Sequence, residues 1–204
     1  MVDWVKTIKE KARTSGVLRV DELASEFHIS EVAVRAALVR QEERGIVEHL
    51  GKKIFINRLT EQFSYRELIG ILRPDAYLSL QSVLRDSGVS TQTPKLLTCV
   101  TASRPGEFHA KSISILFRRL SRKLFWGYLT KQTRYGNYLV AEPEKALLDW
   151  IYLLRQEGSP VPTDELNLHP LDSKRLLTYA AKFPLPVKQL TTELVANLNA
   201  IPRS

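Results

Sequence analysis

Residues 140–150 of the chain, VAEPEKALLDW, hold a group of side chains that could do chemistry. They are Glu142, Glu144, Lys145 and Asp149. Carboxylates beside a lysine are typical of metal-dependent nucleases, in which the acids hold the metal and the lysine stabilises charge. Such a site needs an acid followed by Glu-x-Lys alternating on a strand, whereas the spacing here is Glu-x-x-Lys, and Pro143 would end a strand. The sequence therefore argues against a nuclease site.

A helix that begins at Pro143 explains the same charges without catalysis. Proline suits the first helical position, and the helix dipole favours Glu144 in the first turn. On a helical wheel Glu144 and Asp149 lie about 140° apart, too far for joint acid-base work, whereas Lys145 and Asp149 can form an i, i+4 ion pair on a polar stripe. We expect this helix to be largely buried through one apolar face, formed by Leu147, Trp150, Ile151 and Leu154.

Other enzyme signatures are missing from the sequence. It contains no phosphate-binding glycine loop, no H-E-x-x-H pair and no G-x-S-x-G motif. A single cysteine, Cys99, excludes an internal disulfide framework, and four scattered histidines are too few for a structural zinc site. We therefore expect no catalytic residue, no metal site and no cofactor.

The chain is basic. It has 30 Lys and Arg against 22 Asp and Glu, a net charge of +8, which favours a polyanionic partner. No acid lies between Glu107 and Glu142, and the basic residues in that interval are Lys111, Arg118, Arg119, Arg122, Lys123, Lys131 and Arg134. Aromatic residues are interleaved with them, as in a surface that grips phosphates and stacks bases. Amphipathic strands, with aromatics in the core and charges in solvent, give the same pattern.

The sequence also bears on location. No apolar run reaches the roughly 18 residues that a membrane span needs, and the start, MVDWVKTIKEKAR, lacks the apolar core of a secretory signal. We therefore expect a soluble cytoplasmic protein that does not associate with a membrane.

The first sixty residues predict three helices and a hairpin. Helical spacing favours helices in residues 3–16, 20–30 and 30–45, with Asp21 and Ser30 as capping residues and glycines at two of the ends. Residues 46–56, IVEHLGKKIFI, then predict two strands around a turn at residues 50–52. This order is that of a winged helix-turn-helix, whose last helix enters the major groove of DNA.

Geometry selects the expected DNA contacts. Val34 and Leu38 would face the core, so the DNA-binding set is Ser30, Glu31, Ala33, Arg35 and Arg40, with Lys52 and Lys53 at the wing tip. Ser30 and Arg35 are the strongest members, the two lysines would meet phosphate, and Glu31 and Val32 look poor for reading bases. The alternative is a protein-docking module, because residues 1–58 carry 11 basic and 9 acidic groups, a net charge of only +2.

The remainder, residues 61–204, predicts an α+β domain with a helical end. Residues 73–90 look like one helix with Pro74 in its first turn, and three β-rich runs follow: KLLTCVTA, ISILFRRL and YGNYLVA. Helical patterns return after Gly158, in DSKRLLTYAAKF and PVKQLTTELVANLN. Because strands and helices do not alternate regularly, the fold class is α+β, a winged helix-turn-helix in residues 1–60 followed by a mixed domain.

Two resemblances fit this layout. The run S-x-x-x-V-R-x-A-L from Ser30, followed by E-x-x-G-I-V from Glu42, resembles the recognition helix of GntR-like bacterial regulators. Gln41 departs from that pattern, which usually has a core leucine there, so the end of this helix would pack loosely or lie partly exposed. Residues 72–90, 97–105 and 141–153, together with the helix-turn-helix, resemble the AbiEi antitoxins of bacterial abortive-infection toxin-antitoxin systems.

The second resemblance implies a function. It implies a winged helix that represses its own operon at inverted repeats in double-stranded DNA. It also implies a second domain that counteracts a nucleotidyltransferase-like toxin without a stable complex. Ser30, Arg35, Lys52 and Lys53 would then be operator contacts, and the basic residues from Lys111 to Arg134 would add DNA contact or antitoxin action. A stand-alone regulator or a protein-interaction module without a toxin remains the alternative.

Overall fold

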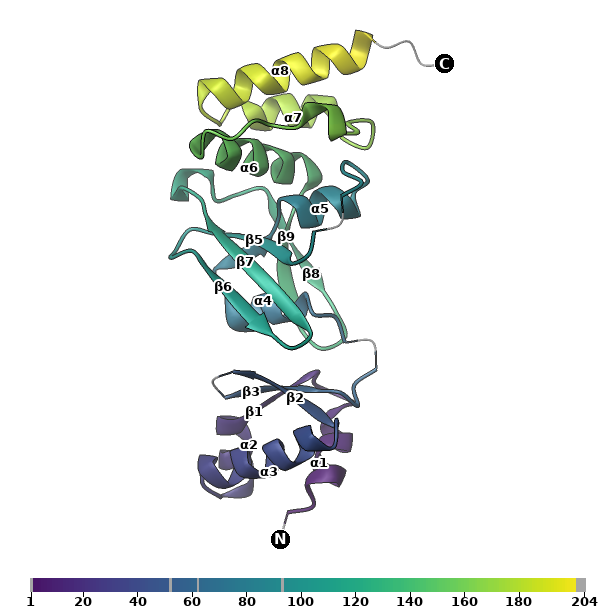
Figure 1. Ribbon diagram of the computed structural model, residues 1–204, viewed down its shortest axis with the longest axis vertical. Coiled ribbons are helices and arrows are strands. Elements are labelled where there is room, and N and C mark those ends of the chain that lie inside the picture. Colours follow the sequence, from purple (N-terminus) through teal and green to yellow (C-terminus); the bar gives the residue numbers. More distant parts are fainter. Residues whose placement is uncertain (1, 52, 62, 93, 201–204) are drawn as a thin grey trace.

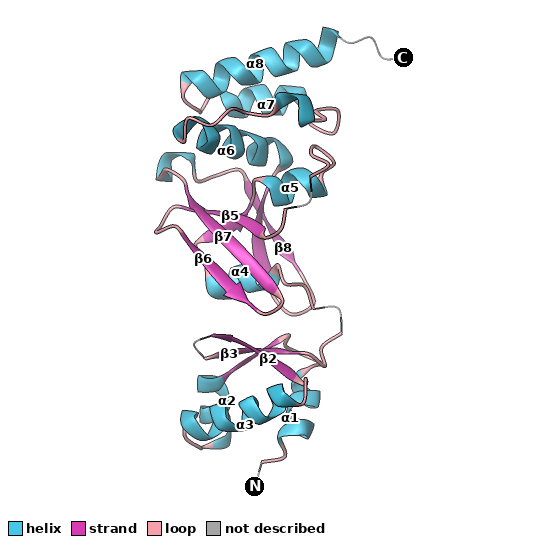
Figure 2. Cartoon of the chain, viewed as in Figure 1, coloured by secondary structure: helices cyan, strands magenta, loops and turns pink. Residues whose placement is uncertain are grey.

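Two β-sheets lie between groups of helices at the two ends of the molecule (Figure 1). The computed structural model describes residues 2–51, 53–61, 63–92 and 94–200. Helices and strands are mixed without regular alternation, so the α+β class is confirmed (Figure 2). Within the described residues no helix is long and apolar enough to cross a membrane.

The N-terminal part, α1 to β3, is formed by three helices and a three-stranded antiparallel sheet. Its elements are α1 (Trp4–Lys11), β1 (Val17–Arg19), α2 (Val20–Phe27), α3 (Glu31–Glu43), β2 (Val47–Gly51) and β3 (Ile54–Asn57). The sheet order is β1-β3-β2. The three helices and the hairpin expected from the sequence are therefore present, and β1 is an additional strand that the periodicity did not reveal.

The caps of α2 and α3 differ in how well the sequence predicted them. The Ser30 hydroxyl accepts a hydrogen bond from the backbone N–H of Ala33 at 3.2 Å, as expected for the N-cap of α3. Asp21 is not a cap, because α2 begins at Val20 directly after β1 and Arg19 occupies the N-cap position. Asp21 instead lies in the first turn, 3.6 Å from the Arg19 guanidinium.

Strand β3 joins the two parts of the molecule. All four of its residues are buried, which requires cover on both faces of the sheet. Phe55 packs with residues of the helices, such as Leu38, whereas Ile54 and Ile56 belong to the core cluster of the second part. Buried Glu48 of β2 adds polar contacts, since its carboxylate accepts hydrogen bonds from Ser112 and pairs with Arg58.

The second part, α4 to α8, is formed by a six-stranded sheet covered by helices. Its helices are α4 (Glu67–Leu72), α5 (Gln81–Asp86), α6 (Pro143–Gln156), α7 (Ser173–Ala180) and α8 (Leu185–Ala200). Its strands are β4 (Ala76–Leu78), β5 (Leu97–Thr101), β6 (Gly106–Ala110), β7 (Ile113–Arg119), β8 (Tyr128–Gln132) and β9 (Asn137–Ala141). The sheet order is β6-β7-β5-β4-β9-β8, and α6, α7 and α8 stack at one end (Figure 1).

The single helix expected in residues 73–90 is wrong. Residues 76–78 form strand β4 in the middle of the sheet, between β5 and β9. Leu80 then has φ +56°, in the left-handed region that a helix cannot continue through, and α5 begins only after it. Gly88, with φ +73°, follows the end of α5.

Candidate nucleic-acid interface

Helix α3 presents a face to solvent that carries most of the expected DNA contacts. Its buried side is made by Val34, Ala37, Leu38 and Gln41. The side chains of Ser30, Ala33, Arg35 and Arg40 are all exposed, and Glu31 is half-exposed. The structure therefore leaves this part of the expected set accessible to a partner.

The hairpin turn is tied to the start of α3 by an ion pair. The Lys53 ammonium donates to the Glu31 carboxylate at 2.6 Å, and about half of each side chain is exposed (54% and 44%). Glu31 therefore holds a wing-tip lysine beside the N-terminus of the helix rather than pointing freely at a ligand. Lys52, the other expected wing-tip contact, lies outside the described residues.

Gln41 was expected to pack loosely or to lie partly exposed, and partial exposure is wrong. Its side chain is 6% exposed and occupies the buried side of α3, where a leucine would fit. Its amide oxygen has no hydrogen-bond partner among the described residues. Leaving a buried polar atom unpaired costs about 1–3 kcal/mol. Burial of the polar side chain was unexpected because the residue type alone indicated the surface.

The basic residues from Lys111 to Arg134 fall into three separate places. Lys111 lies in the β6–β7 turn, at the start of β7. Arg118, Arg119, Arg122 and Lys123 follow at the other end of β7, about 20 Å along the strand. Lys131 and Arg134 belong to β8 and the β8–β9 turn, at the opposite edge of the sheet. The segment has basic residues and no acidic ones in the sequence, but its charges do not form one surface.

The middle group contributes to an arginine-lined cavity of about 900 Å³. Arg119 and Arg122 lie in its wall with Arg104, and the described residues that line it include no carboxylate. Arg104 comes from the turn between β5 and β6, outside the acid-free interval, and for that reason was not singled out. Arg118 is different, because it pairs with Glu157 of the loop after α6.

The aromatic residues of this segment pack against the core of the second part. Phe125 and Tyr128 pack around Tyr77, with each ring centroid 4.9 Å from that of Tyr77. Trp126 lies between Tyr179 and Phe183, at 5.0 and 6.0 Å between centroids. The packing therefore accounts for these aromatic residues as half-buried members of the core of the second part.

Lys145 and Asp149 form an ion pair in the core instead of on a polar stripe. Both side chains are 0% exposed. Asp149 also accepts hydrogen bonds from the hydroxyls of Tyr77 at 2.8 Å and Ser79 at 3.0 Å, and Lys145 donates to Tyr77 at 3.0 Å. The ammonium also lies 5.1 Å from the Trp126 ring centroid, a cation–π contact.

The environment opposes ionisation of this pair. Burial lowers the pKa of the Lys145 ammonium and raises the pKa of the Asp149 carboxyl, while their mutual attraction acts in the opposite sense. Burial also raises the pKa of the Tyr77 phenol far above its usual range, so Tyr77 stays protonated and donates to Asp149. Gly127 allows the lysine to pass, because a Cβ there would lie 2.9 Å from Lys145 Cγ.

The two glutamates at the start of α6 have separate structural contacts. The Glu142 carboxylate accepts a hydrogen bond from the Tyr179 hydroxyl at 2.5 Å, and that of Glu144 accepts one from the Asp172 backbone N–H at 2.9 Å. Both therefore fasten α6 to α7 and its preceding turn. The four charges singled out in VAEPEKALLDW do not converge on one site.

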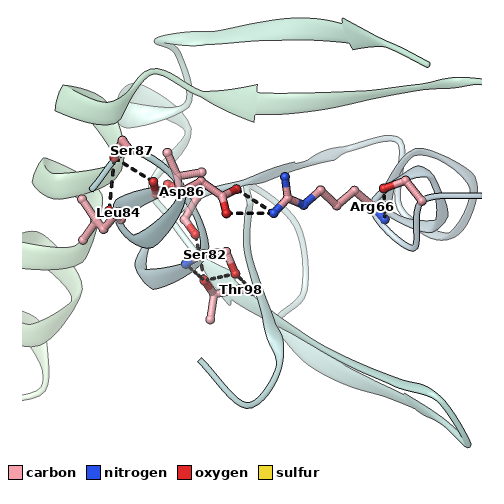
Figure 3. Close-up of polar contacts among 9 residues, drawn as sticks. Arg66, Ser82, Leu84, Asp86, Ser87 and Thr98 are labelled. Atoms are coloured by element: carbon pink, nitrogen blue, oxygen red, sulfur yellow. Dashed lines mark hydrogen bonds and ion pairs between the residues drawn. The ribbon is translucent and has the colours of Figure 1, made fainter. Parts of the chain in front are cut away.

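A second cavity, of about 570 Å³, lies beside the segment that connects the two parts of the molecule. Arg66 from that segment reaches Asp86 of α5, with 2.7 Å between their nitrogen and oxygen atoms (Figure 3). Beneath it, Ser82 and Thr98 exchange hydrogen bonds between α5 and β5 (Figure 3). The Arg66–Asp86 contact ties the connecting segment to α5. Among the described residues, no group of three or more His, Cys, Asp or Glu suited to a metal is found.

A solved structure has a similar fold. It is a crystal structure of the RV2827C protein from Mycobacterium tuberculosis, with a TM-score of 0.55 and 13% sequence identity. The match covers 94% of this chain and 75% of that one. No family model and no curated protein sequence matches the chain.

Proposed function

We propose that the chain is a DNA-binding regulator whose residues 1–60 form a winged helix-turn-helix. In this proposal α3 enters the major groove of a double-stranded operator and the β2–β3 hairpin is the wing. The observation that carries it is the accessible face of α3, where Arg35 and Arg40 are exposed on the two flanks of the helix. Lys53 adds a cation close to the N-terminal end of the same helix.

We further propose that the regulator is an antitoxin of the AbiEi type. The resemblance rests on the helix-turn-helix and on residues 72–90, 97–105 and 141–153, and a buried polar network joins the first and the last of these three segments. Tyr77 and Ser79 lie in the first segment, and Lys145 and Asp149 lie in the last. The proposed partners are therefore an operator with inverted repeats and, functionally, a nucleotidyltransferase-like toxin, without a stable complex between the proteins.

Co-expression tests the antitoxin proposal. If a nucleotidyltransferase-like gene lies beside the gene of this chain, its expression alone should arrest growth, and expression of the full chain in trans should restore it. A matched control is the toxin gene with an empty vector. Arrest that the full chain does not relieve, or a gene with no such neighbour, would leave the stand-alone regulator as the better description.

The wing has its own test, the salt dependence of DNA binding. Each phosphate contact that is lost should reduce the slope of log K against log salt by about 0.9. We expect Lys53→Ala to produce a change of about this size for every duplex that the chain binds, because a phosphate contact does not read sequence. Glu31→Gln is the matched variant: it keeps Lys53 but removes its carboxylate partner, and it should strengthen binding. A loss restricted to one sequence would contradict the phosphate role of Lys53.

A further inference from the structure

Helix α3 has a second apolar side that faces solvent. Val32 is 79% exposed, the highest exposure of any large hydrophobic side chain among the described residues, and Val39 is 40% exposed. Ala36 is also exposed. At 100° per residue, Ala36 lies about 40° from Val32 and Val39 about 20° on the other side. These residues form an aliphatic stripe nearly opposite the buried side of the helix.

Basic side chains border this stripe on both flanks. On the same wheel Arg35 lies about 60° from Val32 on one side and Arg40 about 80° on the other. Both arginines are exposed. Glu43 falls on the stripe one turn after Val39, at the last residue of α3. The aliphatic stripe with its basic flanks is therefore confined to the first three turns of the helix.

This pattern fits the major groove better than a protein surface. A row of two valines and one alanine is too small an apolar area for a stable protein interface, which buries about 800 Å² on each partner. The two flanking arginines are suited to phosphates or to guanine edges on either side of an inserted helix. The one apolar group that the major groove offers is the C5 methyl of thymine.

We propose that Val32 and Ala36 recognise thymine methyl groups, so that the preferred duplexes carry thymines where the first turns of α3 meet the bases. The inference rests on the proposed function, since it assigns the sequence preference of the same helix. Valine donates and accepts no hydrogen bond, which is why it looked poor for base reading from the sequence. Methyl recognition needs only apolar contact, and the exposure of Val32 provides it.

Deoxyuridine separates methyl recognition from every other form of readout, because it lacks the C5 methyl of thymine but pairs in the same way. The full chain would first select its preferred sequences from a pool of random duplexes. The selected duplex would then be made with thymine or with deoxyuridine at the enriched positions. We expect each contacted methyl that is removed to weaken binding about fourfold.

Val32→Ala is the informative variant, and it is not expected to unfold the chain because alanine favours a helix more than valine does. It should weaken binding to the thymine duplex and reduce the preference for thymine over deoxyuridine, because Ala36 still contacts a methyl group. Leu129→Ala, which truncates a 62% exposed leucine on β8, is the matched control and should preserve the full difference.

The outcomes distinguish this inference from the function on which it rests. If wild type binds thymine and deoxyuridine duplexes equally while Arg35→Ala weakens both, methyl recognition is overturned and DNA binding stands. If no duplex is enriched from the pool, both are overturned. If Val32→Ala changes self-association of the chain but not its affinity for the duplex, the stripe is a protein contact and the inference is overturned.

Discussion

Lys145→Ala is expected to lower the free energy of unfolding by about 3–5 kcal/mol, the usual cost of removing one partner of a buried ion pair. The substitution leaves the fully buried Asp149 carboxylate with only the hydroxyls of Tyr77 and Ser79. It also removes the cation from the rings of Trp126 and Phe183. Urea denaturation of the full chain, followed by circular dichroism, measures the effect.

Two further variants show whether the loss comes from an unpaired charge. Lys188→Ala removes an exposed lysine from α8 and should change stability little. Replacing both partners, with Lys145→Met and Asp149→Leu together, should cost much less than Lys145→Ala, because no charge remains buried. A double variant that is as unstable as the single one would show that packing, not charge, dominates this site.

Asp149→Asn provides a check on the structural interpretation of the same cluster. It leaves the Lys145 ammonium buried without a carboxylate, so it should impair folding or the packing of α6. A stably folded Asp149→Asn variant that had lost only antitoxin activity would contradict this interpretation and reopen a functional role for the cluster.

The network illustrates which features the sequence could predict. The i, i+4 spacing correctly indicated that Lys145 and Asp149 could pair, because helix geometry is local. Their burial depends on Trp126 before α6 and on Phe183 beyond α7, and no pattern within residues 140–150 contains those positions. Tyr77 was assigned to a helix because apolar residues there also recur at helical spacing, whereas its burial between β5 and β9 is a tertiary effect.

The positions of the charged residues were likewise predictable only where they depend on local helix geometry. Exposure of Arg35 was predictable because Val34 and Leu38 fix the buried side of α3. The positions of the basic residues from Lys111 to Arg134 could not be predicted from the sequence. The length of β7 separates Lys111 from the arginines at its other end, and β8 lies at the opposite edge of the sheet. Arg104 joined Arg119 and Arg122 only through the fold.

Arg35→Ala is expected to weaken binding to the duplex selected from the random pool by about 1–3 kcal/mol, or roughly fivefold to 150-fold. Arg35 is exposed on α3 between the buried face and the aliphatic stripe, within reach of base edges if the helix lies in the major groove. An arginine that contacts guanine directly should also relax specificity at one position, whereas one that contacts phosphate should weaken all sequences equally. Titration with single-base variants of the duplex distinguishes these roles.

A matched control is Arg155→Ala, which removes an exposed arginine from the last turn of α6, in the second part of the molecule. It changes the net charge by the same amount, so a general electrostatic effect should appear in both variants and a recognition effect only in Arg35→Ala. Equal affinities for wild type and Arg35→Ala would remove α3 as the recognition helix. If DNA were still bound, the arginine-lined cavity of Arg104, Arg119 and Arg122 would become the first place to look for the contact.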